Sequence, residues 1–255
     1  MLSKTLFCAV LVTGLAVTFS SPAEAAKVLI VKGSFYTTDL ANQLTSSGNT
    51  VTELTSYDAA TLAAYDAVIH YGNNFVDQAA LATFVNSGGN LIWTPWAGLN
   101  FRIDAPLQIF ANGGRLIFSQ LNPSVNVLSP GDPLLAGVSF PAADTTNIGR
   151  TSDIDFVAGV TQVADWSDGV GLVGHRSLGT GNVIGVNMQV ITSDTAYQVI
   201  NQPFASQLFN NAVNFKNVGA VPEPSTWAFM LVGFGAIGFG MRRRRGQKVT
   251  VRYAM

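Results

Sequence analysis

Few residues of this chain have reactive side chains, because its 255 residues include one cysteine and two histidines. Cys8 lies in an apolar stretch near the amino terminus, so the rest of the chain has no thiolate for a disulfide, a metal or a nucleophilic attack. His70 and His175 are too few for a histidine-rich metal site. The acidic segments 153–155 and 165–168 lack the spacing of a calcium-binding loop. We therefore expect no metal and no cofactor.

The side chains best suited to bind a ligand follow the ends of predicted strands. They offer a cation, a hydroxyl, an imidazole, an amide and an indole, and they are Lys32, Ser34, His70, Asn73 and Trp96. Polar groups beside aromatic faces would suit a sugar or another small polar ligand. The alternative is that these are ordinary surface-loop residues without a ligand.

A catalytic role would need an activated nucleophile. Ser34 and His70 could form a serine-hydrolase triad with an aspartate, but no Gly-x-Ser-x-Gly segment surrounds Ser34. Gly33 is likewise isolated from the glycine series of a phosphate-binding loop. We assign no catalytic residue and expect a binding module, with a cryptic serine-type hydrolase as the alternative.

Alternating patterns in the first half predict the elements that position these residues. Apolar runs predict strands at 27–31, 50–54, 66–70 and 91–94. Amphipathic segments predict helices at 38–46, 59–64 and 77–87. Asp77 is expected to cap the last of these helices. Strands and helices that alternate with short links predict a parallel sheet with right-handed crossovers. Loops at the carboxyl ends of parallel strands meet at one edge, so the ligand-binding candidates should lie together there.

After Pro95 the pattern changes to short strands separated by proline-containing loops. We expect strands at 162–164, 171–174 and 182–187, and a final helix at 205–215. Gly179-Thr180-Gly181 predicts a hairpin turn between the last two strands.

Five segments resemble the class I glutamine amidotransferase-like superfamily. They are KVLIV at 27–31, YDAVI at 65–69, FVNSGGNLI at 84–92, DPLLAGV at 132–138 and GTGNVI at 179–184. The resemblance implies an α/β fold with a flavodoxin-like, mostly parallel sheet and flanking helices. Active members of the superfamily place a cysteine at the turn after the fourth strand, where this chain reads Thr94-Pro95-Trp96-Ala97-Gly98. The resemblance therefore implies a fold and no amidotransferase activity.

The amino terminus has the order of a secretory signal. Lys4 precedes an apolar run over 5–19, and Ala23-Glu24-Ala25 supplies small residues at the two positions that a signal peptidase reads. We predict that residues 1–25 are a signal peptide and that the mature chain starts near Ala26.

The carboxyl terminus resembles the PEP-CTERM sorting signal of Gram-negative bacteria. We expect the signal to occupy residues 219–255, as a linker, a transmembrane helix at 225–241 and a basic cytoplasmic tail. Its characteristic residues are Pro222, Glu223, Pro224, Trp227, Arg242, Arg243, Arg244 and Arg245. The resemblance implies processing by an exosortase. Such tails are also associated by name with ice-binding proteins, but the domain lacks the regularly spaced threonine pairs of an ice-binding face.

Residues 26–218 remain as one α/β domain. Seven basic and thirteen acidic residues within 26–220 give a net charge of −6, which argues against nucleic acid as a partner. We expect a protein that is exported, anchored in the inner membrane and then placed at the cell surface or outside the cell. Its expected partners are signal peptidase, an exosortase, the membrane, and an exopolysaccharide or surface protein. A purely structural role in the matrix is a further alternative.

Overall fold

A computed structural model describes residues 25–32, 37–71, 76–94, 103–111, 115–190, 200–216 and 233–234, with only the backbone for 115–120. The predicted signal peptide and transmembrane segment lie almost entirely outside these residues. Among the helices within the described ranges, none combines the length and the apolar character that crossing a membrane requires.

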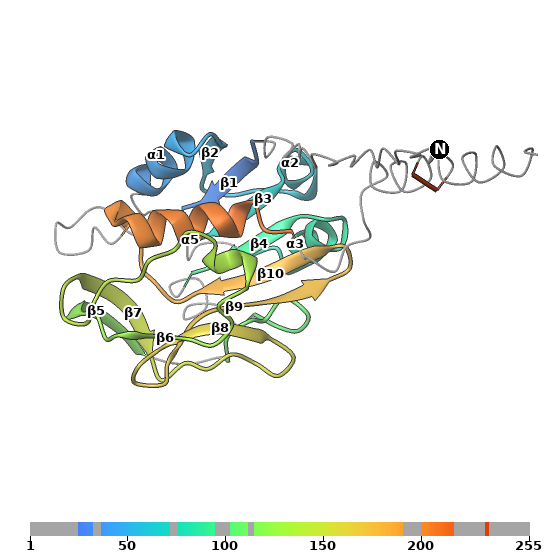
Figure 1. Cartoon of the computed structure of the whole chain (residues 1–255). Helices are drawn as coiled ribbons and strands as arrows, with labels where there is room; N and C mark the ends of the chain where they lie inside the picture. Colours follow the sequence, from blue (N-terminus) through green and yellow to red (C-terminus); the bar gives the residue numbers. More distant parts are fainter. Residues whose placement is uncertain are drawn as a thin grey trace, which may run out of the picture.

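The described chain forms a mixed α/β fold around one eight-stranded sheet (Figure 1). The sheet has the order β2-β1-β3-β4-β10-β9-β8-β6. The first five strands in this order are parallel and are β2 (Thr50–Leu54), β1 (Lys27–Val31), β3 (Ala67–His70), β4 (Asn90–Trp93) and β10 (Gly181–Val186). The last three are antiparallel and are β9 (Gly171–Leu178), β8 (Thr161–Trp166) and β6 (Val125–Val127). The parallel part has the doubly wound order 2-1-3-4-5. These observations confirm the predicted mostly parallel sheet with flanking helices.

The central strands are apolar on both faces because helices cover both faces. On one face, α1 (Thr38–Ser46) and α5 (Pro203–Val213) contact each other. On the other face lie α2 (Ala59–Leu62) and α3 (Gln78–Asn86), which also contact each other. Every residue of β3, β4 and β10 is buried between these layers.

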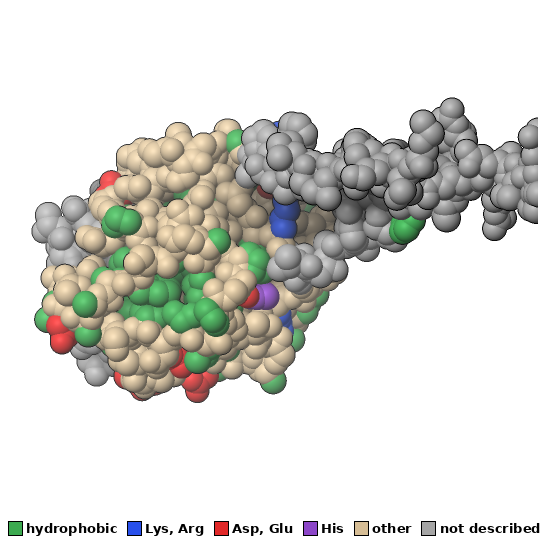
Figure 2. Space-filling view, in the orientation of Figure 1, with side chains coloured by type: hydrophobic (Ala, Val, Ile, Leu, Met, Phe, Trp, Pro, Cys, Tyr) green, Lys and Arg blue, Asp and Glu red, His purple; other side chains and the backbone are tan. Residues whose placement is uncertain are grey.

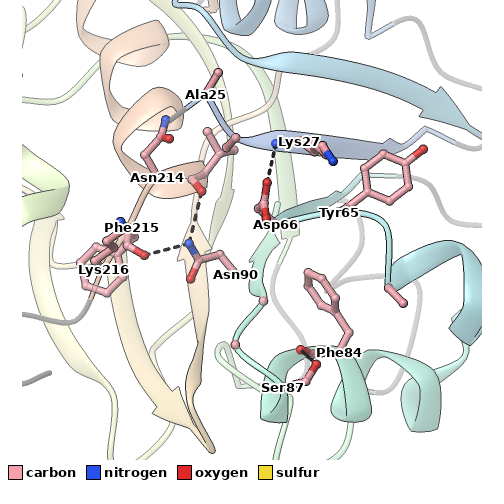
Figure 3. A pocket seen from close by; sticks show the side chains of 15 residues that line it. Ala25, Lys27, Tyr65, Asp66, Phe84, Ser87, Asn90, Asn214, Phe215 and Lys216 are labelled. Atoms are coloured by element: carbon pink, nitrogen blue, oxygen red, sulfur yellow. Dashed lines mark hydrogen bonds between the residues drawn. The ribbon is translucent and has the colours of Figure 1, made fainter. Parts of the chain in front are cut away.

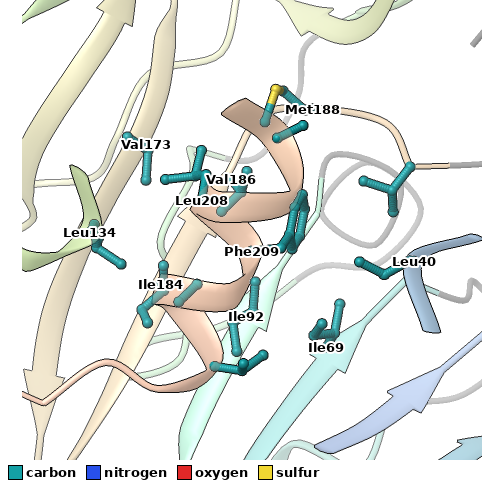
Figure 4. Close-up of a cluster of buried hydrophobic side chains, with 14 of the residues drawn as sticks. Leu40, Ile69, Ile92, Leu134, Val173, Ile184, Val186, Met188, Leu208 and Phe209 are labelled. Carbon is teal, nitrogen blue, oxygen red and sulfur yellow. The ribbon is translucent and has the colours of Figure 1, made fainter. Parts of the chain in front are cut away.

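The larger part of the core lies between α5 and the sheet. Leu208 and Phe209 of α5 lie over Ile92, Ile184 and Val186, all with no exposed surface (Figure 4). Burial of a large apolar side chain stabilises the fold by about 1.5–3 kcal/mol relative to an exposed one. This packing holds the carboxyl-terminal helix of the domain against the strands formed earlier in the chain.

The predicted helices of the first half form, with one correction. The Asp77 carboxylate accepts a hydrogen bond from the Ala80 amide at 2.9 Å and caps α3 as expected. Asp58 caps α2 in the same way, and hydrogen bonds from Thr61 hold the pKa of this carboxyl below its ordinary value. The prediction that this helix extends to residue 64 was wrong. It ends at Leu62, where the amide of Tyr65 closes a tighter turn on the Leu62 carbonyl.

The second half contains elements that the sequence analysis missed. β5 (Arg115–Leu121) and β7 (Asn147–Ser152) form a separate two-stranded sheet, and a 3-10 turn, η1, covers Pro133–Leu135. β8 and β9 are longer than predicted because their polar ends still pair in the ladder. The last helix starts two residues earlier than predicted, at Pro203, since proline is favoured in a first helical turn. It ends at Val213, so Phe215 packs in the core from beyond the helix.

The predicted hairpin turn lies between β9 and β10 as expected. Gly179 has a φ of +60°, and a Cβ placed there would lie 2.6 Å from the side chain of Asn86. Glycine is therefore required by both the backbone conformation and the close approach of α3.

Candidate functional site

The carboxyl edge of the parallel strands is the place where ligands bind in doubly wound sheets. Here the chain leaves β1 at Lys32, β3 at Tyr71 and β4 at Thr94. β2 lies on one side of β1 and β3 on the other, so the strand order reverses between β1 and β3. This reversal places the expected crevice beside Lys32 and Tyr71.

Two of the five predicted ligand-binding residues lie within the described chain: Lys32 directly follows β1, and His70 ends the neighbouring strand β3. Val31 pairs with His70, so Lys32 is one residue beyond His70 along the edge. The Lys32 ammonium lies 3.7 Å from the Glu53 carboxylate, which also accepts a hydrogen bond from the Thr37 hydroxyl. Ser34, Asn73 and Trp96 lie outside the described residues.

The two residues have different surroundings. His70 is fully buried, with its ring centroid 4.9 Å from Trp93 and 5.9 Å from Tyr57. The Lys32 side chain is one-third exposed at the rim. A ligand at this edge would therefore meet the ammonium directly, whereas the imidazole lies in the aromatic layer below.

Beside His70, Tyr71 turns to the opposite face of the sheet and was not identified from the sequence. Its side chain is fully buried, and burial raises the pKa of the phenol far above its ordinary value, although the neighbouring Gln189 side chain acts to lower it. Gln189 follows β10 and is also fully buried. The carboxyl edge thus rests on a layer of buried polar groups from β3 and the segment after β10.

A histidine–aspartate pair lies on the antiparallel side of the sheet. The His175 Nε2 lies 2.9 Å from Asp132 Oδ2, and both side chains are about nine-tenths buried. The other Asp132 oxygen accepts from the Leu134 amide at 2.9 Å and caps η1. The His175 Nδ1 has no hydrogen-bond partner among the described residues. The pair joins η1 to β9.

Loss of the Asp132 carboxylate is expected to destabilise the fold. Asp132→Ala should lower the free energy of unfolding by about 1–3 kcal/mol, because a buried imidazole and a backbone amide both lose their acceptor. Asp132→Asn keeps one acceptor oxygen of the same shape and should lose less. Chemical denaturation of the two variants checks this order, and an equal loss in both would contradict it.

An ion pair anchors β7 to the turn between β8 and β9. Arg150 is 4% exposed, donates to both carboxylate oxygens of Asp168 and lies 5.6 Å above the ring of Trp166. Partial burial raises the pKa of the Asp168 carboxyl, but the hydrogen bond and the charge of Arg150 outweigh this and lower it overall. The pair stabilises the packing of the small sheet on the large one.

This pair predicts a pH-dependent contribution to stability. Asp168→Asn should lower the free energy of unfolding at pH 7 by about 1 kcal/mol, since solvent at the half-exposed carboxylate screens the pair. A lowered pKa in the folded state means that the contribution is present above the ordinary aspartate pKa and is lost as the pH falls through the folded value. Denaturation curves between pH 7 and pH 3 should therefore converge for the two proteins. A gap at pH 3 as large as the gap at pH 7 would contradict the prediction.

A pocket of about 530 Å³ lies at the amino edge, at the opposite end of the parallel strands (Figure 3). It is lined by the starts of β1 and β4, the residue before β3 and the ends of α3 and α5. The Asn90 amide donates to the carbonyls of Val213 and Phe215 at 3.2 and 2.8 Å, which caps α5. Ala25 and Lys216 both line this pocket. The chain therefore enters and leaves the domain at the same edge.

Hydrophobic side chains gather on the face below α5 in Figure 2. Within the described residues, the exposed large hydrophobic side chains are those of Leu121 at the end of β5, Val127 in β6, Leu128 after it, and Phe234. β6 is one of the two edge strands of the large sheet, at the opposite edge from β2. Among the described residues, no group of three or more metal-binding side chains lies together.

Sequence comparison matches the PEP-CTERM protein-sorting motif to residues 220–245. The chain carries a PEP-CTERM sorting signal. The match begins four residues after Lys216, directly beyond the described domain. This signal marks the protein for export and for sorting by an exosortase, as the tail residues predicted. The curated proteins include no match to the chain.

Solved structures share the fold of the domain at low sequence identity. Two cytoplasmic proteins of Salmonella typhimurium, each 13% identical, have TM-scores of 0.58 and 0.56 and cover 74% and 73% of this chain and 98% of their own. A cold-adapted β-galactosidase from Rahnella, 18% identical, has a TM-score of 0.52 over 74% of this chain and 31% of its own. At these identities the likeness shows the fold alone.

Proposed function

We propose that residues 26–218 form a non-catalytic, amidotransferase-like binding module that the sorting signal displays outside the cell. The supporting observation is that both ends of the domain lie at the amino edge, opposite the edge where doubly wound sheets bind ligands. A tether at the amino edge leaves the carboxyl edge free to face a ligand. Anchoring in the inner membrane, followed by transfer to the cell surface, completes the proposal.

The length of the connection supports this orientation. Three residues, 217–219, lie between Lys216 and the start of the sorting motif, and the four residue steps from 216 to 220 span at most about 14 Å when extended. The five residues of β1 alone measure about 17 Å from the amino to the carboxyl edge. The connection is therefore too short to carry the motif around to the carboxyl edge.

The ligand that we propose is a glycan of the extracellular matrix, bound at the carboxyl edge by Lys32 with Ser34, Asn73 and Trp96. Lys32 and the carboxylate of Glu53 offer a donor and an acceptor at the rim, which suits sugar hydroxyls. The exposed apolar residues at β6 add a surface for a protein partner. A catalytic role has less support, because the only cysteine is Cys8 and His70 is buried.

The test is binding of oligosaccharides from the producing strain's exopolysaccharide to the chain that starts at residue 26, in mild detergent. Lys32→Ala should weaken binding on the order of tenfold, the equivalent of about 1.4 kcal/mol. Lys27→Ala is the matched control, because it removes an exposed lysine from the other end of the same strand. Equal affinities for both variants, or no binding by the parent chain, would overturn the glycan proposal.

A further inference from the structure

Ala26, the first residue of the predicted mature chain, is built into the fold. Its side chain and backbone are 6% exposed, whereas Ala25 before it is exposed. The Ala26 nitrogen lies 3.3 Å from the side-chain oxygen of Asn49, and the Ala26 carbonyl accepts from the Thr50 amide at 2.9 Å. The position of the Ala26 nitrogen is thus fixed by contacts on both sides of it.

Asn49 is held so that its oxygen faces Ala26. The side-chain nitrogen of Asn49 donates to the Leu44 carbonyl at 3.0 Å and to the side-chain oxygen of Asn210 at 2.9 Å. The Asn214 side chain donates to the same Asn49 oxygen at 3.2 Å. Because Asn49 is buried and its nitrogen is fully used, its oxygen can only serve as an acceptor at this position.

The surroundings favour a positive charge at the Ala26 nitrogen. Leu44 lies in the last turn of α1 and Asn214 caps the end of α5, so two helix carboxyl termini with partial negative charge lie beside it. The Asp66 carboxylate accepts from the Lys27 amide at 2.8 Å (Figure 3). Consecutive backbone nitrogens are less than about 4 Å apart, which places this carboxylate within roughly 7 Å of the Ala26 nitrogen.

Two lysines also line the pocket and oppose a further positive charge. Both Lys27 and Lys216 are exposed, so water and salt screen their repulsion. Tyr65 is the remaining titratable residue of the pocket lining. The balance therefore favours the ammonium, because its acceptor is buried and its repelling neighbours are solvated.

We propose that signal peptidase cuts the Ala25–Ala26 bond and that the new α-ammonium of Ala26 binds in this site, so that removal of the signal peptide stabilises the domain. Hydrolysis adds one water molecule across the bond and leaves a carboxylate on Ala25 and a protonated amine on Ala26. Loss of Ala25 opens the pocket to water, which takes the two ammonium hydrogens that Asn49 does not accept. The proposal rests on export and is independent of the ligand at the carboxyl edge.

The test compares two chains that start at Ala26 and keep all residues to Met255, one with a free amine and one with an acetylated amine. The acetyl group replaces the Ala25 carbonyl, removes the charge and leaves the one N–H that faces Asn49, so the acetylated chain reproduces the uncut peptide bond. At pH 6 the free-amine chain should melt higher by roughly 2–4 °C. A bound ammonium has a raised pKa, so this advantage is present below the ordinary α-amino pKa of about 7.7–8.0 and is lost as the pH rises through the folded value. Equal melting temperatures at pH 6 would overturn the proposal.

A second pair of variants tests the charge around the amine. Asp66→Asn keeps an oxygen for the Lys27 amide and should reduce the melting difference between the free and acetylated chains. Asp144→Asn is the control: it also removes one exposed carboxylate, from a loop that does not line the pocket. It should leave the melting difference between the free and acetylated chains unchanged. Amino-terminal sequencing of the exported protein completes the test. A mature terminus other than Ala26 would overturn this proposal while leaving export intact.

Discussion

Replacing Pro222, Glu223 and Pro224 with alanine is expected to abolish sorting of the exported chain. The replaced residues lie within the matched sorting motif at 220–245. Proline restricts φ and has no amide donor, so a Pro-x-Pro sequence offers a protease fewer backbone conformations to select from than three alanines would. We expect the processed fraction to fall at least about tenfold, the equivalent of about 1.4 kcal/mol of lost recognition.

Immunoblots of membrane and culture-medium fractions measure this effect, since the unprocessed chain stays with the membrane and is larger. The control is the same triple alanine replacement at Gln247, Lys248 and Val249, which lie beyond the matched motif. Normal processing of the Pro222–Pro224 variant would show that the motif is not what the exosortase reads in this chain.

Gly181→Ala is expected to destabilise this fold strongly, because the added methyl group would overlap backbone atoms. Gly181 begins β10 against the end of α3, and an added Cβ would lie 2.3 Å from the carbonyl oxygens of Gly89 and Val85. These are backbone atoms of the end of α3 and of the link that leads into β4. The Gly89 carbonyl also accepts from the Asn182 amide, so a shift there would disturb the ladder between β10 and β4. We expect a loss of about 3 kcal/mol from this overpacking and a melting temperature lower by about 6–12 °C.

Gly131→Ala is the matched control for this substitution. A Cβ added at Gly131 would have no other atom within 4 Å, and the residue lies in an exposed loop. Its melting temperature should change by less than about 2 °C, because exposed substitutions shift stability by about 0.5 kcal/mol or less. If both variants melt alike, the close contact of β10 with α3 is absent in solution.

The first half of the fold could be predicted from sequence because each element there is specified locally. The β-branched run of β1, the Asp77 cap of α3 and the glycines after that helix act within a few residues of one another. Local signals of this kind fix the type and order of elements, and short links between them fix parallel pairing. Their boundaries depended on tertiary contacts, as the early end of α2 shows.

The second half was less predictable because its elements depend on distant partners. β5 pairs with β7 more than two dozen residues later in the chain, and Asn187 fixes the backbone of Thr151 on β7 by two hydrogen bonds. Polar strand residues of this kind resemble loop sequence until a pairing partner is known. Loops rich in proline supplied no periodic pattern that would have indicated the small sheet.

The candidate site shows the same division. From the sequence, Lys32 was expected just after one strand and His70 at the end of another. A parallel sheet brings such residues to one edge. Their exposure could not be read from the sequence, because it depends on aromatic rings contributed by Tyr57 and Trp93 from other segments. The buried phenol of Tyr71 on the opposite face was missed for the same reason.

By itself, the sequence determined the sorting signal and the lack of a thiol in the exported domain, because both depend only on the order and type of residues. Only the tertiary structure decided that Ala25 and Lys216, almost two hundred positions apart, line one pocket at the amino edge. It also decided that the Asn49 oxygen faces the first residue of the domain. These placements follow from the packing of α1 and α5 on one sheet, and packing joins residues that no local pattern connects.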